Sequence, residues 1–121
     1  MDLNKFSREV HQNAVEHGFW DSPVSFGEIV ALCHSELSEA LEEYRKGCPL
    51  EYADDFPREK RITDPAEFGG GKPEGIAVEM ADTIIRILDW CGAKNVDIEG
   101  VLERKHSYNK TRSYRHGGKK L

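Results

Sequence analysis

Two long segments of this chain repeat apolar side chains at the spacing of an α-helix, and this repetition constrains the fold more than any other feature. When successive residues are placed about 100° apart on a helical wheel, each segment shows one apolar stripe. The stripes contain Ile29, Val30, Cys33, Leu37, Ala40, Leu41 and Tyr44, and then Ile76, Ala77, Met80, Ile84, Ile87, Leu88 and Cys91. Because no segment shows a convincing strand pattern, the sequence predicts an all-α fold.

Capping residues and breakers set the expected helix boundaries. Ser25 with Glu28 three residues later forms a capping box, while Pro73 near a helix start and Gly92 after a helix end fit the usual asymmetry. The predicted helices run from Asn4 or Ser7 to about His17, from Ser25 to about Lys46, from Pro73 or Glu74 to Cys91, and from Asp97 to about Tyr108. This pattern predicts a single four-helix-bundle-like domain over residues 1–121.

The segment at about 48–74 lacks helical periodicity and contains four prolines and the run Gly69-Gly70-Gly71. A loop of this length in a compact domain usually has a function or is mobile. A short hairpin within it is an alternative. We interpret the loop as an insertion that covers a site or contacts a neighbouring subunit, and residues from about 113 to 121 as a basic tail.

Charge is unevenly distributed along the chain. The net charge is -5, yet Arg104 to Leu121 contains seven Lys or Arg and no acid, which leaves 10 basic and 22 acidic residues elsewhere. An acidic body with a basic end suggests that the end holds phosphate, or that the acids hold a cation that brings phosphate. The acidic body argues against duplex binding, and we expect no stable nucleic-acid complex.

Cellular context is also suggested by what the sequence lacks. Three cysteines without a C-x-x-C pair argue against a disulfide framework or a zinc cluster; Cys33 and Cys91 are expected to be small core residues. No run of about 20 apolar residues and no secretory signal is present, so we expect a cytoplasmic protein.

Each long helix carries two acids three residues apart beside its apolar stripe. The pairs are Glu36 with Glu39, and Glu79 with Asp82. Facing pairs would repel each other, and hard divalent cations such as Mg²⁺ or Mn²⁺ relieve such repulsion. Neither motif contains a histidine, which argues against zinc and against a ferritin-type di-iron site. The alternative is an ordinary acidic helix surface.

A basic face is expected on the last helix. Lys105, Asn109 and Arg112 share one side at i, i+4 and i+7, where they can hold phosphate or sugar, and Tyr108 adds an aromatic edge or a hydroxyl. The alternative is a solvated helix whose cations lie at its negative end.

Taken together, these blocks resemble the all-α nucleoside triphosphate pyrophosphohydrolases of the MazG-like family, which are related to the all-α dUTP and dCTP pyrophosphatases. The resemblance rests on E-x-x-E at 36–39, E-x-x-D at 79–82 within AVEMADTIIRILD, and KHSYNKTR at 105–112 followed by HGGKK at 116–120. It covers the chain from about Asn13 onward. One departure is the 39 residues between Glu39 and Glu79, more than is usual in the family.

The resemblance implies a Mg²⁺-dependent enzyme, with Mn²⁺ as a possible substitute, that cleaves a nucleoside or deoxynucleoside triphosphate into the monophosphate and pyrophosphate. It implies that Glu36, Glu39, Glu79 and Asp82 bind metal and that Lys105, Asn109, Tyr108 and Arg112 bind substrate. Among the acids, Glu39 is the expected proton acceptor, with Glu36 beside it. A homodimer or homotetramer is also implied.

Other residues have two interpretations each. Trp20 and His11, near the first turn, are candidates to contact the base, but Phe19 and Trp20 also fit a core or a dimer contact. Glu43 either supports the acid site or is solvated. Arg86 and Asp89, three residues apart, are expected to form a structural salt bridge. The competing functions are a non-catalytic helical module that binds nucleotides or a protein, and nucleic-acid binding through the basic tail.

Overall fold

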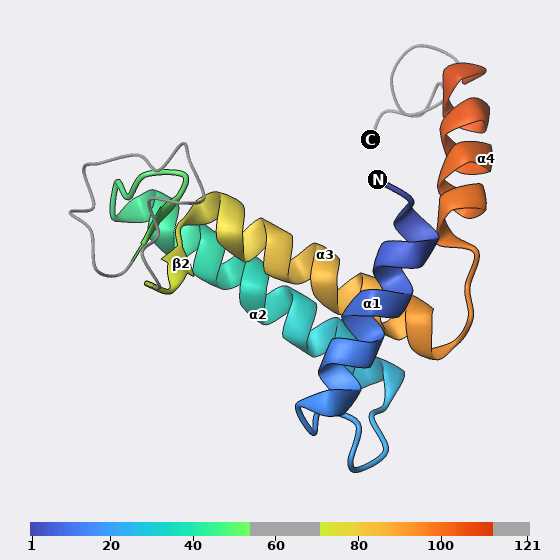
Figure 1. Ribbon diagram of the computed structural model, residues 1–121. Helices are drawn as coiled ribbons and strands as arrows, with labels where there is room; N and C mark the ends of the chain where they lie inside the picture. Colours follow the sequence, from blue (N-terminus) through green and yellow to red (C-terminus); the bar gives the residue numbers. More distant parts are fainter. Residues whose placement is uncertain (54–70, 113–121) are drawn as a thin grey trace.

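The computed structural model describes residues 1–53 and 71–112 of the chain. Within them lie the helices α1 (Leu3–Glu16), α2 (Phe26–Arg45), α3 (Ile76–Ala93) and α4 (Ile98–Lys110), with a short antiparallel pair, β1 (Tyr52–Ala53) and β2 (Pro73–Glu74). Helices α2 and α3 lie side by side as an antiparallel hairpin, and α1 crosses α3 (Figure 1). Helix α4 begins beside the N-terminal end of α1 and projects away from the hairpin. The prediction of an all-α fold is confirmed. Most of the predicted loop, 54–70, and the tail, 113–121, lie outside the described residues.

The first two helices begin with side-chain caps. Ser25 accepts a hydrogen bond from the Glu28 backbone at 3.1 Å, and the Glu28 carboxylate accepts one from the Ser25 backbone at 3.4 Å, so the predicted capping box is confirmed. The prediction that Asn4 or Ser7 caps α1 is wrong, because Asp2 accepts the Lys5 backbone N–H at 3.0 Å. Ser7 is buried instead and donates to the Leu88 carbonyl of α3 at 2.5 Å.

The start of α3 differs from the prediction. Pro73 and Glu74 pair with β1, so the helix begins only at Ile76, after Gly75. Gly75 has φ +119°, and a Cβ there would lie 2.4 Å from the Leu50 carbonyl oxygen, so only glycine fits. The short hairpin that the sequence left as an alternative is therefore present as this two-residue pair.

Gly92 does not end α3 as predicted, since the helix continues to Ala93. A Cβ on Gly92 would lie 2.7 Å from both the Ser7 carbonyl oxygen and the Cβ of His11. The glycine therefore lets α1 cross α3 at close range, and Asn95, with φ 54°, follows the helix end.

The start of α4 is joined to the start of α1. The predicted N-cap Asp97 accepts from the Gly100 backbone at 3.0 Å and from the Asn4 amide at 2.7 Å. Asn4 in turn accepts from the Glu99 backbone at 3.1 Å, and Glu99 accepts from the Leu3 backbone at 2.9 Å. We call these reciprocal bonds the α1–α4 clamp.

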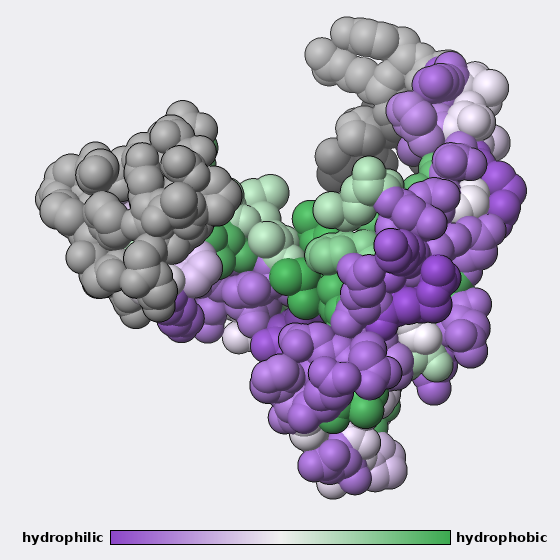
Figure 2. All heavy atoms as spheres, in the orientation of Figure 1, coloured by the Kyte–Doolittle hydropathy of each residue, from purple (hydrophilic) through white to green (hydrophobic). Residues whose placement is uncertain are grey.

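The buried core is small. The buried apolar residues are Ile29, Ala40, Tyr52, Ala53, Leu88 and Cys91, while Cys33 is only half-buried. Much of the predicted apolar stripe of the hairpin is solvent-exposed, including Leu37, Leu41, Tyr44, Met80, Ile84 and Ile87. Figure 2 shows hydrophobic surface on the visible face in the hollow between the hairpin and α4.

Across residues 1–53 and 71–112, no helix combines the length and the apolar character needed to cross a membrane.

Candidate metal centre

Three of the four predicted acids converge between α2 and α3. One carboxylate oxygen each from Glu36, Glu39 and Glu79 lies within 4.8 Å of the others. The antiparallel hairpin produces this arrangement because it sets the acid pair of α2 opposite that of α3. Asp82, one turn beyond Glu79, lines the adjacent pocket together with Glu36.

The electrostatics of this acid cluster match an ion site. The Oε2 atom of Glu79 is buried and has no hydrogen-bond partner among the described residues. Burial, together with the neighbouring Glu36 and Glu39, raises the pKa of Glu79 to about 8. Burial and the charge of Glu36 also raise the pKa of Asp82. Without a cation, the cluster therefore retains a proton at neutral pH.

The residues fit a hard divalent cation. Carboxylate oxygens are the ligands that Mg²⁺ and Mn²⁺ prefer, and a cation would replace the retained proton and satisfy the buried oxygen of Glu79. The exposed side of Glu39 leaves the cluster open to solvent, so water and a phosphate group can complete the coordination.

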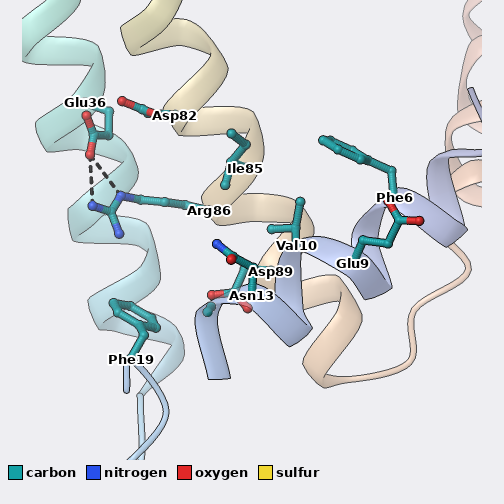
Figure 3. Close-up of a pocket in the computed structure, with 11 residues that line it drawn as sticks. Phe6, Glu9, Val10, Asn13, Phe19, Glu36, Asp82, Ile85, Arg86 and Asp89 are labelled. Atoms are coloured by element: carbon teal, nitrogen blue, oxygen red, sulfur yellow. Dashed lines mark hydrogen bonds and ion pairs between the residues drawn. The ribbon is translucent and has the colours of Figure 1, made fainter. Parts of the chain in front are cut away.

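Arg86 contacts this cluster from α3 (Figure 3). The Oε1 atom of Glu36 accepts a hydrogen bond from Arg86 Nε at 3.0 Å and forms an ion pair with Arg86 Nη2 at 2.9 Å. Burial alone would raise the pKa of Glu36, but hydrogen bonds with Glu79 and Arg86 and the charge of Arg86 bring it below its usual value. The predicted salt bridge between Arg86 and Asp89 is therefore wrong, because Arg86 reaches across to α2.

Asp89 points toward α1 instead. Its side chain is buried and accepts from Trp20 Nε1, at 3.0 and 3.1 Å to its two oxygens, and it pairs with His11 Nδ1 at 2.8 Å. The Trp20 ring packs edge-on against His11 and Phe19. Asp89 lines the pocket, but Trp20 and His11 do not, so the predicted role of both in base binding stays a prediction.

The pocket beside the cluster has a volume of about 520 Å³, within the usual range for small-molecule sites. Its polar end is formed by Glu36, Asp82 and Arg86, and its walls come from α1, α3 and the first turn: Phe6, Glu9, Val10, Asn13, Ala14, Phe19, Ile85 and Asp89. The sequence analysis did not single out Phe6, Val10 or Ala14 as site residues. The sequence signal that could have identified them is their apolar character at helical spacing, because such a stripe on α1 packs against α3, the helix that also carries Glu79 and Asp82.

The predicted phosphate-binding residues lie elsewhere. Lys105, Tyr108 and Asn109 are exposed on α4, which contacts α1 and projects away from the hairpin (Figure 1), and Arg112 is exposed just after its end. Lys105 and Arg112 lie 5.0 and 5.9 Å from the centre of the Tyr108 ring. None of the four lines the pocket. Within one chain, the structure does not bring this basic face to the acid cluster.

Glu43 has a structural contact. It accepts the Tyr52 hydroxyl at 3.0 and 3.1 Å to its two oxygens, which fixes β1 against α2. Glu43 is therefore not simply solvated, and its bond supports the end of the hairpin from which the linking segment departs.

Comparison with known proteins found no match, whether with family profiles, curated proteins or solved structures. What this site can do is therefore inferred from its own geometry.

Proposed function

We propose that this protein is a Mg²⁺-dependent nucleoside triphosphate pyrophosphohydrolase of the MazG-like type, with Mn²⁺ as a substitute. Its substrate is a nucleoside or deoxynucleoside triphosphate, and its products are the monophosphate and pyrophosphate. The observation that supports this proposal is the convergence of Glu36, Glu39 and Glu79, with one buried unpaired oxygen, beside a pocket whose walls are largely apolar but also carry Glu9, Asn13 and Asp89.

The shape of the site suggests how a substrate lies in it. The triphosphate is placed at the polar end, next to Glu36 and Asp82, and the nucleoside lies against the apolar wall formed by Phe6, Val10 and Ile85. Asn13 lines the same pocket and has both a donor and an acceptor for a base or sugar. Phe19, at the end of the pocket, offers an aromatic surface to the base.

Four acids hold the metal in this proposal: Glu36, Glu39, Glu79 and Asp82. When bound, Mg²⁺ supplies neutralisation of phosphate charge and acidification of a coordinated water. Glu39 is the exposed member of the cluster, so it is the acid that water reaches most easily. Glu39 accepts the proton of the water that attacks the triphosphate, and the bond between the α and β phosphates breaks.

Assembly belongs to the same proposal. The exposed apolar residues of α2 and α3 favour association of copies into a homodimer or homotetramer, because monomers rarely leave such surface uncovered. Association also gives the basic face of α4 a route to phosphate, since Lys105, Asn109 and Arg112 do not reach the pocket of their own chain.

A nucleotide panel tests the activity. Purified protein is incubated with each NTP and dNTP and Mg²⁺, and the products are separated by ion-exchange chromatography. We expect a monophosphate and pyrophosphate in equal amounts. Release of orthophosphate contradicts the assigned bond, and tight nucleotide binding without products favours a non-catalytic module.

The variant Glu39→Gln tests the site itself. Loss of a metal ligand and proton acceptor is expected to lower turnover by about 100-fold or more. The matched control is Glu42→Gln. Glu42 is an exposed acid of the same helix that forms an ion pair with Lys46 at 3.9 Å. The control keeps wild-type turnover, and circular dichroism shows both variants folded. Full activity in Glu39→Gln rules out the role of this acid.

A further inference from the structure

Arg86 makes an unusual connection to the acid cluster, and its role goes beyond the proposed activity. Both of its contacts, the hydrogen bond from Nε and the ion pair through Nη2, end on the same oxygen of Glu36, Oε1. A guanidinium that bonded both oxygens of a carboxylate would occupy both of them. Here the contacts end on one oxygen, so Arg86 does not occupy Oε2.

We propose that Arg86 is the positioning residue of the metal centre, which fixes the carboxylate of Glu36 so that its second oxygen is presented together with Glu39 and Glu79. This inference rests on the metal centre of the proposed function. The orientation matters because a Glu side chain has several rotatable bonds, and groups that hydrogen-bond a metal-binding carboxylate commonly tune its affinity for the ion.

Burial gives the contact its strength. The side chain of Glu36 is 12% exposed and that of Arg86 is 29% exposed. A charge-assisted bond in such partial shelter is less screened than one on the surface. The planar guanidinium also fixes direction, which a lysine ammonium cannot do because it acts as a point charge.

Arg86 could instead be a positive charge that occupies the place of the metal ion, and the geometry distinguishes the two roles. A side chain that merely replaced the metal would have to leave before the ion enters, and its removal would strengthen metal binding. Arg86 approaches Glu36 from the pocket side of α3, one turn after Asp82. It can therefore stay bound to Oε1 while the ion occupies the cluster.

The test measures binding of Mn²⁺ alone, without nucleotide, by isothermal titration calorimetry and by the loss of the free-ion electron paramagnetic resonance signal. We expect Arg86→Gln to weaken Mn²⁺ binding by about 10–100-fold. Arg86→Lys, which keeps the charge but not the fork, recovers part of this loss. The control Arg45→Gln, an exposed arginine at the end of α2, binds as the wild type does.

A double variant sharpens the test. If Arg86 acts through Glu36, then Arg86→Gln adds little once Glu36→Gln is present, whereas independent effects would add. Thermal unfolding of each metal-free variant checks folding, and if Arg86→Gln does not fold, Arg86→Lys decides by its own loss of affinity.

The outcomes are distinct. Wild-type protein that binds no Mn²⁺ overturns the metal centre and this role with it. Wild-type protein that binds Mn²⁺, with an affinity that folded Arg86→Gln leaves unchanged or increases, overturns the role of Arg86 alone and leaves the proposed activity standing.

Discussion

Glu79 is the residue at which burial and negative charge oppose each other most strongly in the acid cluster. One oxygen of its carboxyl, Oε2, is buried and has no partner among the described residues, and burial and two neighbouring acids together raise its pKa to about 8. A carboxyl in this position is stable in two forms. It either keeps its proton, or it loses the proton and binds a cation in its place. The same residue therefore links metal binding, pH and stability.

The pH dependence of stability tests this link. Because the folded pKa of Glu79 lies above its ordinary value of 4.5, its contribution is fully present below about pH 4.5 and is lost as pH rises through about 8. We expect the metal-free protein to lose stability from pH 5 to 9 and Mg²⁺ to stabilise it more at pH 8.5 than at pH 6. Differential scanning fluorimetry measures both trends.

The variant Glu79→Gln is the control for this trend, since it removes the titrating group and should flatten the difference between the pH values. Mn²⁺ affinity of the wild type should fall by up to about tenfold per pH unit below pH 8, because each ion displaces one proton. An affinity independent of pH between 6 and 8 would contradict the assignment of that proton to Glu79.

At the scale of elements, the crossing of α1 over α3 determines the pocket. Ser7 is bonded to the Leu88 carbonyl, and Gly92 admits the α1 backbone where any other residue would collide. The crossing brings Phe6 and Val10 to the pocket wall, and the bonds of Asp89 to Trp20 and His11 hold the turn that follows α1. The position of the pocket wall therefore depends on the packing of α1 against α3.

Gly92→Ala tests the crossing. Alanine usually favours a helix over glycine by about 1 kcal/mol. Here its Cβ would lie 2.7 Å from the Ser7 carbonyl oxygen and from the Cβ of His11, so we expect a net loss of about 1–3 kcal/mol from overpacking. Urea unfolding followed by circular dichroism gives the value. The matched change Gly27→Ala in α2, where the nearest atom is Ser25 Oγ at 3.8 Å, is neutral or stabilising.

The sequence predicts some of these contacts and not others. The convergence of Glu36, Glu39 and Glu79 follows from two acid pairs on consecutive antiparallel helices, so local spacing sufficed to expect it. The partner of Arg86 was missed because Asp89 is nearest along its own helix, while Glu36 becomes adjacent only through packing. Gly92 was assigned as a terminator for the same reason, since the contact with α1 that requires it has no local signature.

At the scale of the whole molecule, the small core and the exposed stripe of residues 1–53 and 71–112 are what the proposed assembly would require of one half of an interface. Leu41 and Ile84 are 50% and 54% exposed, although both belong to the apolar stripes that predict the helices. The sequence shows that these residues avoid water, but not whether their own chain or a second copy covers them. Local periodicity is identical in the two cases.

Association is tested by charge substitution. We expect the wild type to be a dimer or tetramer by sedimentation velocity, and Leu41→Glu combined with Ile84→Glu to be monomeric, because like charges on the stripe oppose its burial. Val15→Glu on α1, where the valine is 41% exposed, is the control and leaves the assembly intact. A wild type that sediments as a monomer at every concentration contradicts the proposed assembly.

The α1–α4 clamp has a mechanical consequence. Asn4 and Asp97 join the beginning of the helix that walls the pocket to the beginning of the helix that bears the exposed cations. Lys105 lies farther along α4, beyond the helix start that these bonds hold. A displacement of α4 would therefore be transmitted through these bonds to the helix that carries Phe6 and Val10 of the pocket wall.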